Sequence, residues 1–158
     1  MSIERITTTL WNEPSGRVYS ALVDEARHSC KSALLVVRDL DSIDSRATTI
    51  LKMLEQHQSE RTQASEWPGT RLLQGSATVY RYHLTDGCAE TLKRATHHLY
   101  GWLHPNLPED LCFIRDDGSP WLVSIAHERD SYLQLSAAEV ENLKIKLPEL
   151  FAANPTRA

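Results

Sequence analysis

The dipeptide Asp117-Gly118, which lies between two short apolar runs, constrains the fold of this chain more than any other feature. Asp-Gly is a strong signal for a tight hairpin turn, because such turns need the positive φ angles that glycine adopts without strain. A second turn at Arg129-Asp130 extends the hairpin. The pattern therefore predicts an antiparallel three-strand meander over residues 111–135.

The predicted meander has two unlike faces, since successive strand residues point to opposite sides of a sheet. Pairing Phe113 with Leu122 places both on a wholly apolar face, which we expect to be core. That face also carries Leu111, Ala126, Leu133 and Leu135. The other face, called the second face below, becomes polar and aromatic towards the second turn. It carries Cys112, Ile114, Trp121, Val123, Ile125, His127, Tyr132 and Gln134.

The rest of the chain predicts helices and further strands around this meander. Apolar spacing and capping residues predict helices over residues 17–30, 43–54, 85–102 and 136–148. The last of these begins with the capping box Ser136-Ala-Ala-Glu139. Apolar or alternating runs predict strands over residues 3–11, 33–37 and 77–84. This order predicts an α+β fold: a mixed sheet that ends in the antiparallel meander, with helices packed on it.

The length of 158 residues suits a single domain with a real core. The most polar stretch, about residues 56–70, is predicted to be a long loop that ends near Pro68-Gly69. Neither side of it holds enough apolar sequence to stand as a separate domain. Residues 151–158 are predicted to be a C-terminal tail, so one α+β domain spans residues 1–158.

Charge and cysteine content narrow the class of protein. The formal net charge is −4, and no basic stripe of the kind that binds nucleic acid is visible. Three widely spaced cysteines do not make a disulfide framework, and each is expected to be an inert thiol. No apolar run reaches signal-peptide or membrane-span length. We therefore expect a cytoplasmic protein that binds neither nucleic acid nor membrane.

The sequence offers no assembled catalytic or metal-binding motif. It lacks the glycine-rich and nucleophile-elbow patterns that mark phosphate binding or serine catalysis. His97 and His104 are about 10 Å apart on a helix, too far to share one zinc ion. The acidic pairs Glu109-Asp110 and Asp116-Asp117 fall at opposite ends of one strand. We therefore expect no metal, no cofactor and no catalytic residue.

His127-Glu128 is the sharpest local candidate for chemistry, as a general base in a small hydrolase-like enzyme. We favour a different interpretation, because neighbouring strand residues point to opposite faces and cannot jointly hold one small substrate. In the favoured interpretation, the second face contacts a partner protein through Trp121, His127, Tyr132 and Gln134, with Glu128 and Asp130 at the rim of the contact. Tyrosine and tryptophan are frequent binding hot spots. The rival interpretation is that the N-terminal helices cover this face and make it a second core.

Two segments carry a resemblance to other proteins. They are YRYHLTDGCAETL (residues 80–92) and LYGWLHPNLPEDLCFIRDDGSPWLVSIAHE (residues 99–128). They resemble a group of uncharacterised bacterial proteins of similar size, and the resemblance carries over no catalytic residue. Small acidic α+β proteins without catalytic motifs are common among bacterial immunity proteins and antitoxins. By that analogy the chain is expected to be a binding module that neutralises a toxin domain, which its acidity would suit if the toxin is basic. A structural subunit of a larger bacterial assembly is the third alternative.

Overall fold

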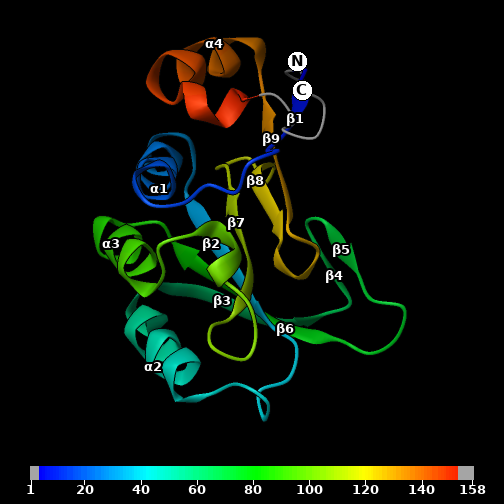
Figure 1. Ribbon diagram of the computed structural model, residues 1–158. Coiled ribbons are helices and arrows are strands. Elements are labelled where there is room, and N and C mark those ends of the chain that lie inside the picture. The colour runs from blue at the N-terminus through cyan, green and yellow to red at the C-terminus, as the bar shows by residue number, and fades with distance from the viewer. Residues whose placement is uncertain (1–3, 153–158) are drawn as a thin grey trace.

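The computed structural model describes residues 4–152 as four helices that cover one face of a seven-stranded sheet (Figure 1). The helices are α1 (Arg17–Ser29), α2 (Ser45–Leu54), α3 (Asp86–Ala95) and α4 (Ala137–Lys146). The strands of the sheet are β1 (Ile6–Thr9), β2 (Ser32–Val37), β3 (Gln58–Ala64), β6 (Ala77–His83), β7 (Glu109–Ile114), β8 (Pro120–Ile125) and β9 (Asp130–Leu135). The predicted α+β class is confirmed.

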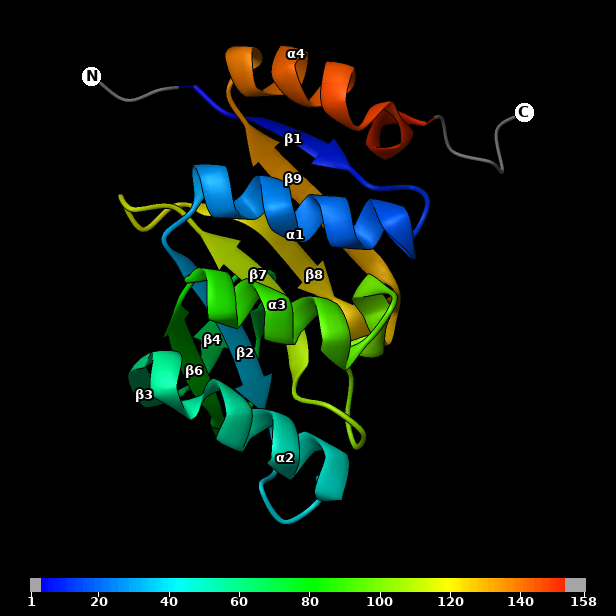
Figure 2. The same cartoon turned by 90° about the vertical axis from the view of Figure 1, so that its left-hand side faces the viewer.

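The sheet has the order β1-β9-β8-β7-β2-β6-β3. Each pairing between its described strands is antiparallel, so the sheet contains no parallel pair where a mixed sheet was expected. Figure 2 shows α4, α1, α3 and α2 side by side in front of the sheet. The short hairpin of β4 (Glu66–Trp67) and β5 (Thr70–Arg71) lies on the opposite side (Figure 1). None of the helices in the described part of the chain is long and apolar enough to cross a membrane.

The main core lies between the helices and the sheet. Its largest fully buried side chains include Tyr19, Tyr82, Trp102 and Phe113. The polar groups of these rings are partly paired with one another: the indole Nε1 of Trp102 donates to the Tyr19 hydroxyl at 2.9 Å, and that hydroxyl donates to the carbonyl of Leu92 at 2.6 Å. Burial of these large rings is the dominant stabilising term in a domain of this size.

A second, smaller core lies beneath the β4–β5 hairpin, on the helix-free face of the sheet. Its buried members are Leu34, Val36, Trp67, Ala77, Val79, Cys112, Ile114 and Val123. Gly69, with φ at +87°, lets the hairpin backbone approach closely, because a Cβ there would lie 2.6 Å from Val123 Cγ1. Much of the second face of the meander is therefore core, and the hairpin rather than the N-terminal helices covers it.

Helices α2, α3 and α4 begin at residues whose side chains cap them, whereas α1 begins at Gly16 without a side-chain cap. Asp44 accepts hydrogen bonds from the amides of Arg46 and Ala47 at the start of α2. Thr85 caps α3, and the capping box of Ser136 and Glu139 opens α4.

Helix α3 ends at Ala95, earlier than the predicted limit near residue 102. The next residues pair with the N-terminal segment instead, because the amide of Gly16 donates to the carbonyl of His97 at 2.7 Å. The amide of Leu99 likewise donates to the carbonyl of Pro14 at 3.0 Å. These long-range bonds satisfy backbone groups that a longer helix would use internally.

The stretch predicted as a polar loop over residues 56–70 is instead largely extended, and this prediction is wrong. It contains β3 and β4, and β3 pairs with β6 at the edge of the sheet. All residues of β3 except Ala64 are exposed, so this strand has no buried face. A strand of this kind lacks the apolar alternation by which strands are recognised. Of the predicted tail, residues 153–158 lie outside the described residues.

The predicted three-strand meander is present as β7, β8 and β9, with Phe113 paired to Leu122. The position of Trp121 was predicted wrongly. A register shift places Ile114 opposite Pro120 rather than opposite Trp121. This irregularity turns the indole into the main core, where it meets the Phe113 ring edge-on with centroids 6.4 Å apart.

The second turn is longer than the predicted two-residue turn at Arg129-Asp130. The chain forms a 3₁₀ turn over Ala126–Glu128, and Asp130 already pairs with Ile125 as the first residue of β9. Leu133 therefore lies opposite Leu122 instead of Ala126. Because this shift spans an even number of residues, Leu133 keeps its predicted core face.

We expect Phe113→Ala to lower the free energy of unfolding by about 3–5 kcal/mol, the usual range for emptying a packed aromatic site. Phe113 is fully buried between the helices and the sheet. Urea denaturation followed by circular dichroism measures the change. Ile145→Ala is the control, because Ile145 is 82% exposed and its removal should cost no more than about 0.5 kcal/mol. A loss below about 1 kcal/mol for Phe113→Ala would contradict the core assignment.

We expect the three cysteine thiols to be unreactive in the folded protein. Cys30, Cys88 and Cys112 are buried and unpaired, and burial raises the pKa of each thiol to about 12. Because the thiolate is the reactive form, a thiol reagent such as Ellman's reagent should react slowly at pH 8. The same titration in concentrated urea should report all three thiols at once. Rapid reaction of the native protein would show that one of these sites is open.

Candidate functional site

Ionisable side chains gather at one end of the sheet, where β2 ends, β7 begins and β8 ends. Arg38 directly follows β2, and Glu109 and Asp110 are the first residues of β7. His104 lies in the segment before β7, and His127 lies in the 3₁₀ turn after β8. Val36 is the strand partner of Glu109, so this arrangement follows from the antiparallel pairing. These five residues are called the Arg38 cluster below.

Arg38 is the central cation of the cluster. Its Nε donates to Glu109 Oε2 at 3.0 Å, and one terminal nitrogen lies 3.9 Å from Asp110 Oδ2. Its guanidinium also lies over the ring of Trp67, 5.3 Å from the ring centroid. Glu109 and Asp110 are almost fully buried, so these contacts offset the high cost of removing two carboxylates from water.

Asp110 joins three segments of the chain. Its Oδ2 accepts a hydrogen bond from the Trp67 indole at 3.0 Å, and its Oδ1 accepts one from the backbone amide of Ala126 at 2.9 Å. The residue has a φ of 59°, a left-handed conformation that aspartate tolerates better than most residues. The β4–β5 hairpin, the start of β7 and the turn after β8 are thus fixed to one carboxylate.

The two histidines of the cluster differ in environment. His104 Nε2 accepts the backbone N–H of Arg38 at 3.3 Å, so its neutral ring carries the proton on Nδ1. The same Nε2 lies 3.4 Å from Glu109 Oε1, a contact that becomes an ion pair when the ring is protonated. His127 is exposed, and its Nε2 lies 3.8 Å from Glu128, which is beyond hydrogen-bond distance.

Within residues 4–152, Glu109, Asp110 and His127 bring ligand atoms within 4.8 Å of one another. Such a group has the spacing of a metal site, but the guanidinium of Arg38 already occupies the cationic position beside Glu109. A divalent ion would have to displace it or accept strong repulsion. The donors of Trp67 and Ala126 also take up oxygens of Asp110. The contacts of the cluster therefore favour a structural role for its carboxylates.

A groove of about 430 Å³ opens beside the Arg38 cluster, between the β4–β5 hairpin and the turn after β8. It is called the hairpin groove below. Its lining consists of Arg38, Gly69, Thr70, Arg71, Leu72, Leu73, Ile125, His127 and Glu128. The side chain of Leu73 is completely exposed, whereas the neighbouring Leu72 packs against the second core. The groove thus combines aliphatic side chains with a charged rim.

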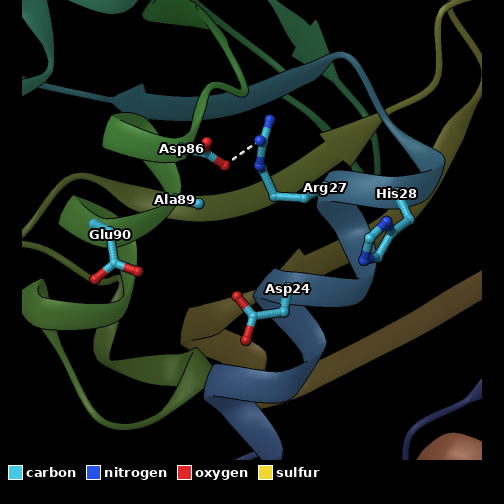
Figure 3. Close-up of a pocket in the computed structure, with 6 residues that line it drawn as sticks. All are labelled: Asp24, Arg27, His28, Asp86, Ala89 and Glu90. Carbon is cyan, nitrogen blue, oxygen red and sulfur yellow. Dashed lines mark hydrogen bonds and ion pairs between the residues drawn. The ribbon is translucent and has the colours of Figure 1, made fainter.

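A larger cleft of about 480 Å³ lies between α1 and α3 on the helical side (Figure 3). Its charged groups pair across the two helices. Arg27 pairs with Asp86, and Lys93 donates to Asp24 at 2.8 Å and lies 2.9 Å from Glu90. The bond to Asp24 is the main reason that the pKa of Lys93 is raised. These ion pairs bridge two helix surfaces, and pairs of this exposed kind contribute little free energy.

The predicted contact residues fall into three groups. His127 and Glu128 line the hairpin groove, and Asp130 is exposed at the start of β9. Tyr132 and Gln134 are half-buried along β9. Trp121 is only 1% exposed, so it does not belong to a contact surface.

The sequence does not predict that Arg38, Trp67 and the carboxylates of Glu109 and Asp110 form one site. One available signal was that two acidic residues open an otherwise apolar strand, a position where unpaired charges are costly. A second was the arginine that directly follows the apolar run of residues 33–37.

Comparison of the chain with models of protein families, with curated proteins and with solved structures found no match. The interpretation of the site therefore depends on its geometry.

We expect Arg38→Met to lower the free energy of unfolding by about 3 kcal/mol, because it leaves two buried carboxylates without a cation. Glu109→Gln should also destabilise the protein. The double variant should lose less than the sum of the two, with a coupling energy of about 1 kcal/mol or more. Urea denaturation of the four proteins at one pH measures this cycle. Additive losses would contradict the ion pair as the organising contact of the cluster.

Proposed function

We propose that this protein is a non-catalytic binding module for another protein. Its most concrete form is an immunity-type or antitoxin-type inhibitor that neutralises a basic toxin domain. The observation that carries the proposal is the hairpin groove, in which the exposed Leu73 stands beside Leu72 and Ile125 within a charged rim. An apolar centre surrounded by polar groups is the usual anatomy of a protein-binding surface.

The Arg38 cluster supports a binding role because its buried carboxylates are paired, although one terminal nitrogen of Arg38 is buried without a hydrogen-bond partner. The Asp110 oxygens accept from Trp67 and Ala126, and Glu109 accepts from Arg38. Such a network makes the floor of the groove rigid. A rigid surface loses little conformational entropy when a partner binds.

The contact region of this proposal includes the predicted residues His127, Glu128 and Asp130, which are exposed at the turn after β8. Tyr132 and Gln134 extend it along β9. In this arrangement the carboxylates of Glu128 and Asp130 steer a basic partner from the rim, and the aliphatic side chains of the hairpin supply apolar contact. Trp121 has no part in it.

One observation favours a second candidate, a small hydrolase-like enzyme that uses His127. The ring lies in a concave groove together with Arg38, and its nitrogen is within 4.8 Å of two buried carboxylates. A general base normally has an orienting partner within about 3.2 Å, which no described contact of His127 supplies. A hydrolytic activity that His127→Ala abolishes without unfolding the protein would decide for this candidate.

We expect Leu73→Asp to abolish capture of the partner, because it places a charge at the apolar centre of the contact region. Capture from a lysate of the source cell, with the bound protein identified by mass spectrometry and its affinity then measured by calorimetry, provides the test. Ile145→Asp is the matched control, since Ile145 on α4 is equally aliphatic and 82% exposed on the helical side. The control should retain wild-type affinity.

Equal loss in both variants would indicate a general effect of charge and contradict the assigned surface. A wild-type protein that captures nothing and is a stable dimer in solution would favour a structural subunit instead.

A further inference from the structure

The helix-free side of the sheet holds a second groove, of about 250 Å³, beside the edge strand β3. It is called the edge groove below. Its floor is apolar and comes from Leu34, Ala64, Trp67, Pro68 and Val79. Its polar lining comes from Glu60, Thr62, Glu66 and Arg81. The carboxylates of Glu60 on β3 and Glu66 on β4 thus flank an apolar slot.

Strand β3 is the last strand of the sheet and pairs only with β6 among the described strands. Its outer row of backbone donors and acceptors is therefore available to another extended chain. The pairing with β6 is irregular between Gln58 and Glu60 and regular from Glu60 to Ala64. This regular part is the stretch whose Glu60, Thr62 and Ala64 side chains line the edge groove.

The two glutamates are only loosely engaged within the protein. Glu60 lies 3.9 Å from Arg81, and Glu66 lies 4.0 Å from Arg71. Both carboxylates are more than half exposed, and both of these contacts with arginine are longer than a hydrogen bond. Exposed pairs at such distances contribute little free energy, so both groups are free to meet a cation from outside.

We propose that the edge groove and strand β3 dock an extended, lysine- or arginine-bearing segment of the partner protein. The segment adds a strand to the edge of the sheet, so that backbone hydrogen bonds form with Glu60–Ala64. One basic side chain lies in the groove, with its methylene stem against Val79 and Trp67 and its charged head between the two glutamates. This inference rests on the proposed function and names the chemistry of the partner.

The choice of a basic segment follows from the side chains that surround the slot. A carboxylate would meet two like charges, Glu60 and Glu66, against the single guanidinium of Arg81 in the lining. A purely apolar side chain would fill the slot but bring no cation to either glutamate. A lysine or arginine matches both parts of the groove. The formal net charge of −4 brings such a segment towards the protein at long range.

The test uses the full chain and a short synthetic peptide of alternating lysine and valine, followed by nuclear magnetic resonance. We expect the peptide to shift the backbone amides of residues 60–64 and the indole N–H of Trp67. The matching peptide of alternating glutamate and valine should cause no such shift. A lysine peptide with alternate backbone amides methylated should also fail, because it cannot add a strand. Equal binding of the acidic or the methylated peptide would overturn the proposal.

Charge reversal at the groove supplies the second measurement. The double variant Glu60→Lys plus Glu66→Lys should weaken binding of the lysine peptide about tenfold, since two attractions become repulsions. The matched control is Glu4→Lys plus Glu141→Lys, which changes the net charge equally at exposed positions away from the groove. An equal loss of peptide binding in the control would show that net charge alone causes the effect, and would overturn the assignment of the edge groove as the binding site.

The outcomes separate this inference from the proposed function. In one outcome Leu73→Asp loses the captured partner, whereas the Glu60→Lys plus Glu66→Lys variant binds that partner at full affinity. This result would support the proposed function and contradict the edge site. In another outcome no partner is captured, but the lysine peptide binds at residues 60–64 and charge reversal weakens that binding. This result would support the edge site and contradict the proposed function. If the amides of residues 60–64 shift when the protein concentration is raised without peptide, the edge of β3 pairs with a second copy of the chain. That result would overturn the proposal.

Discussion

The arrangement of the helix-free side of the sheet depends on the hydrogen bonds that the carboxylate of Asp110 accepts. It receives the indole N–H of Trp67 from the hairpin and the amide of Ala126 from the turn after β8. Leaving either donor unpaired in the interior would cost about 1–3 kcal/mol. Arg38 supplies the compensating charge and covers the Trp67 ring. A single buried side chain thus sets where the hairpin lies and how the second turn is shaped.

This contact also explains why an unusual backbone conformation is kept. Asp110 has a positive φ, which costs an ordinary residue about 1–2 kcal/mol. Such strain persists where the surrounding structure fixes it from several directions. Here two hydrogen bonds and an ion pair do so. The sheet separates the molecule into two sides. One side is closed by four helices, whereas the other carries the hairpin, both grooves and the free edge of β3.

The parts of the fold that depend on local chemistry could be predicted from the sequence. Asp44, Thr85 and Ser136 cap their helices as their side chains predict. The first hairpin turns where Asp117-Gly118 predicts it, but its loop is one residue longer than the two-residue turn expected, because Arg115 pairs with Ser119. The parts that depend on distant partners could not. The end of α3 is set by bonds to the segment around Pro14, which no local pattern reports.

The candidate site shows the same division between local and distant information. His127 was predicted at the end of a strand, yet it lies with Glu128 in an exposed 3₁₀ turn, and the groups that organise the surroundings of both are far away in the chain. Asp110 meets Trp67 across 43 positions, and Arg38 meets Glu109 across 71. Trp121 was misplaced because one register irregularity turns a side chain to the opposite face. Alternation predicts a face only while the pairing is regular.

The polar composition of β3 explains both why the sequence did not predict this strand and how its exposed edge stays soluble. A strand is recognised in a sequence because one of its faces is buried, and β3 has no such face. Its polar and charged residues therefore look like a loop, although they pair regularly with β6 from Glu60 onward. The property that hid the strand is also the one that keeps an exposed edge soluble, since charged side chains discourage pairing with a second copy. On the side of the edge groove the carboxylates of Glu60 and Glu66 outnumber the single guanidinium of Arg81, which is why the proposed partner segment is basic.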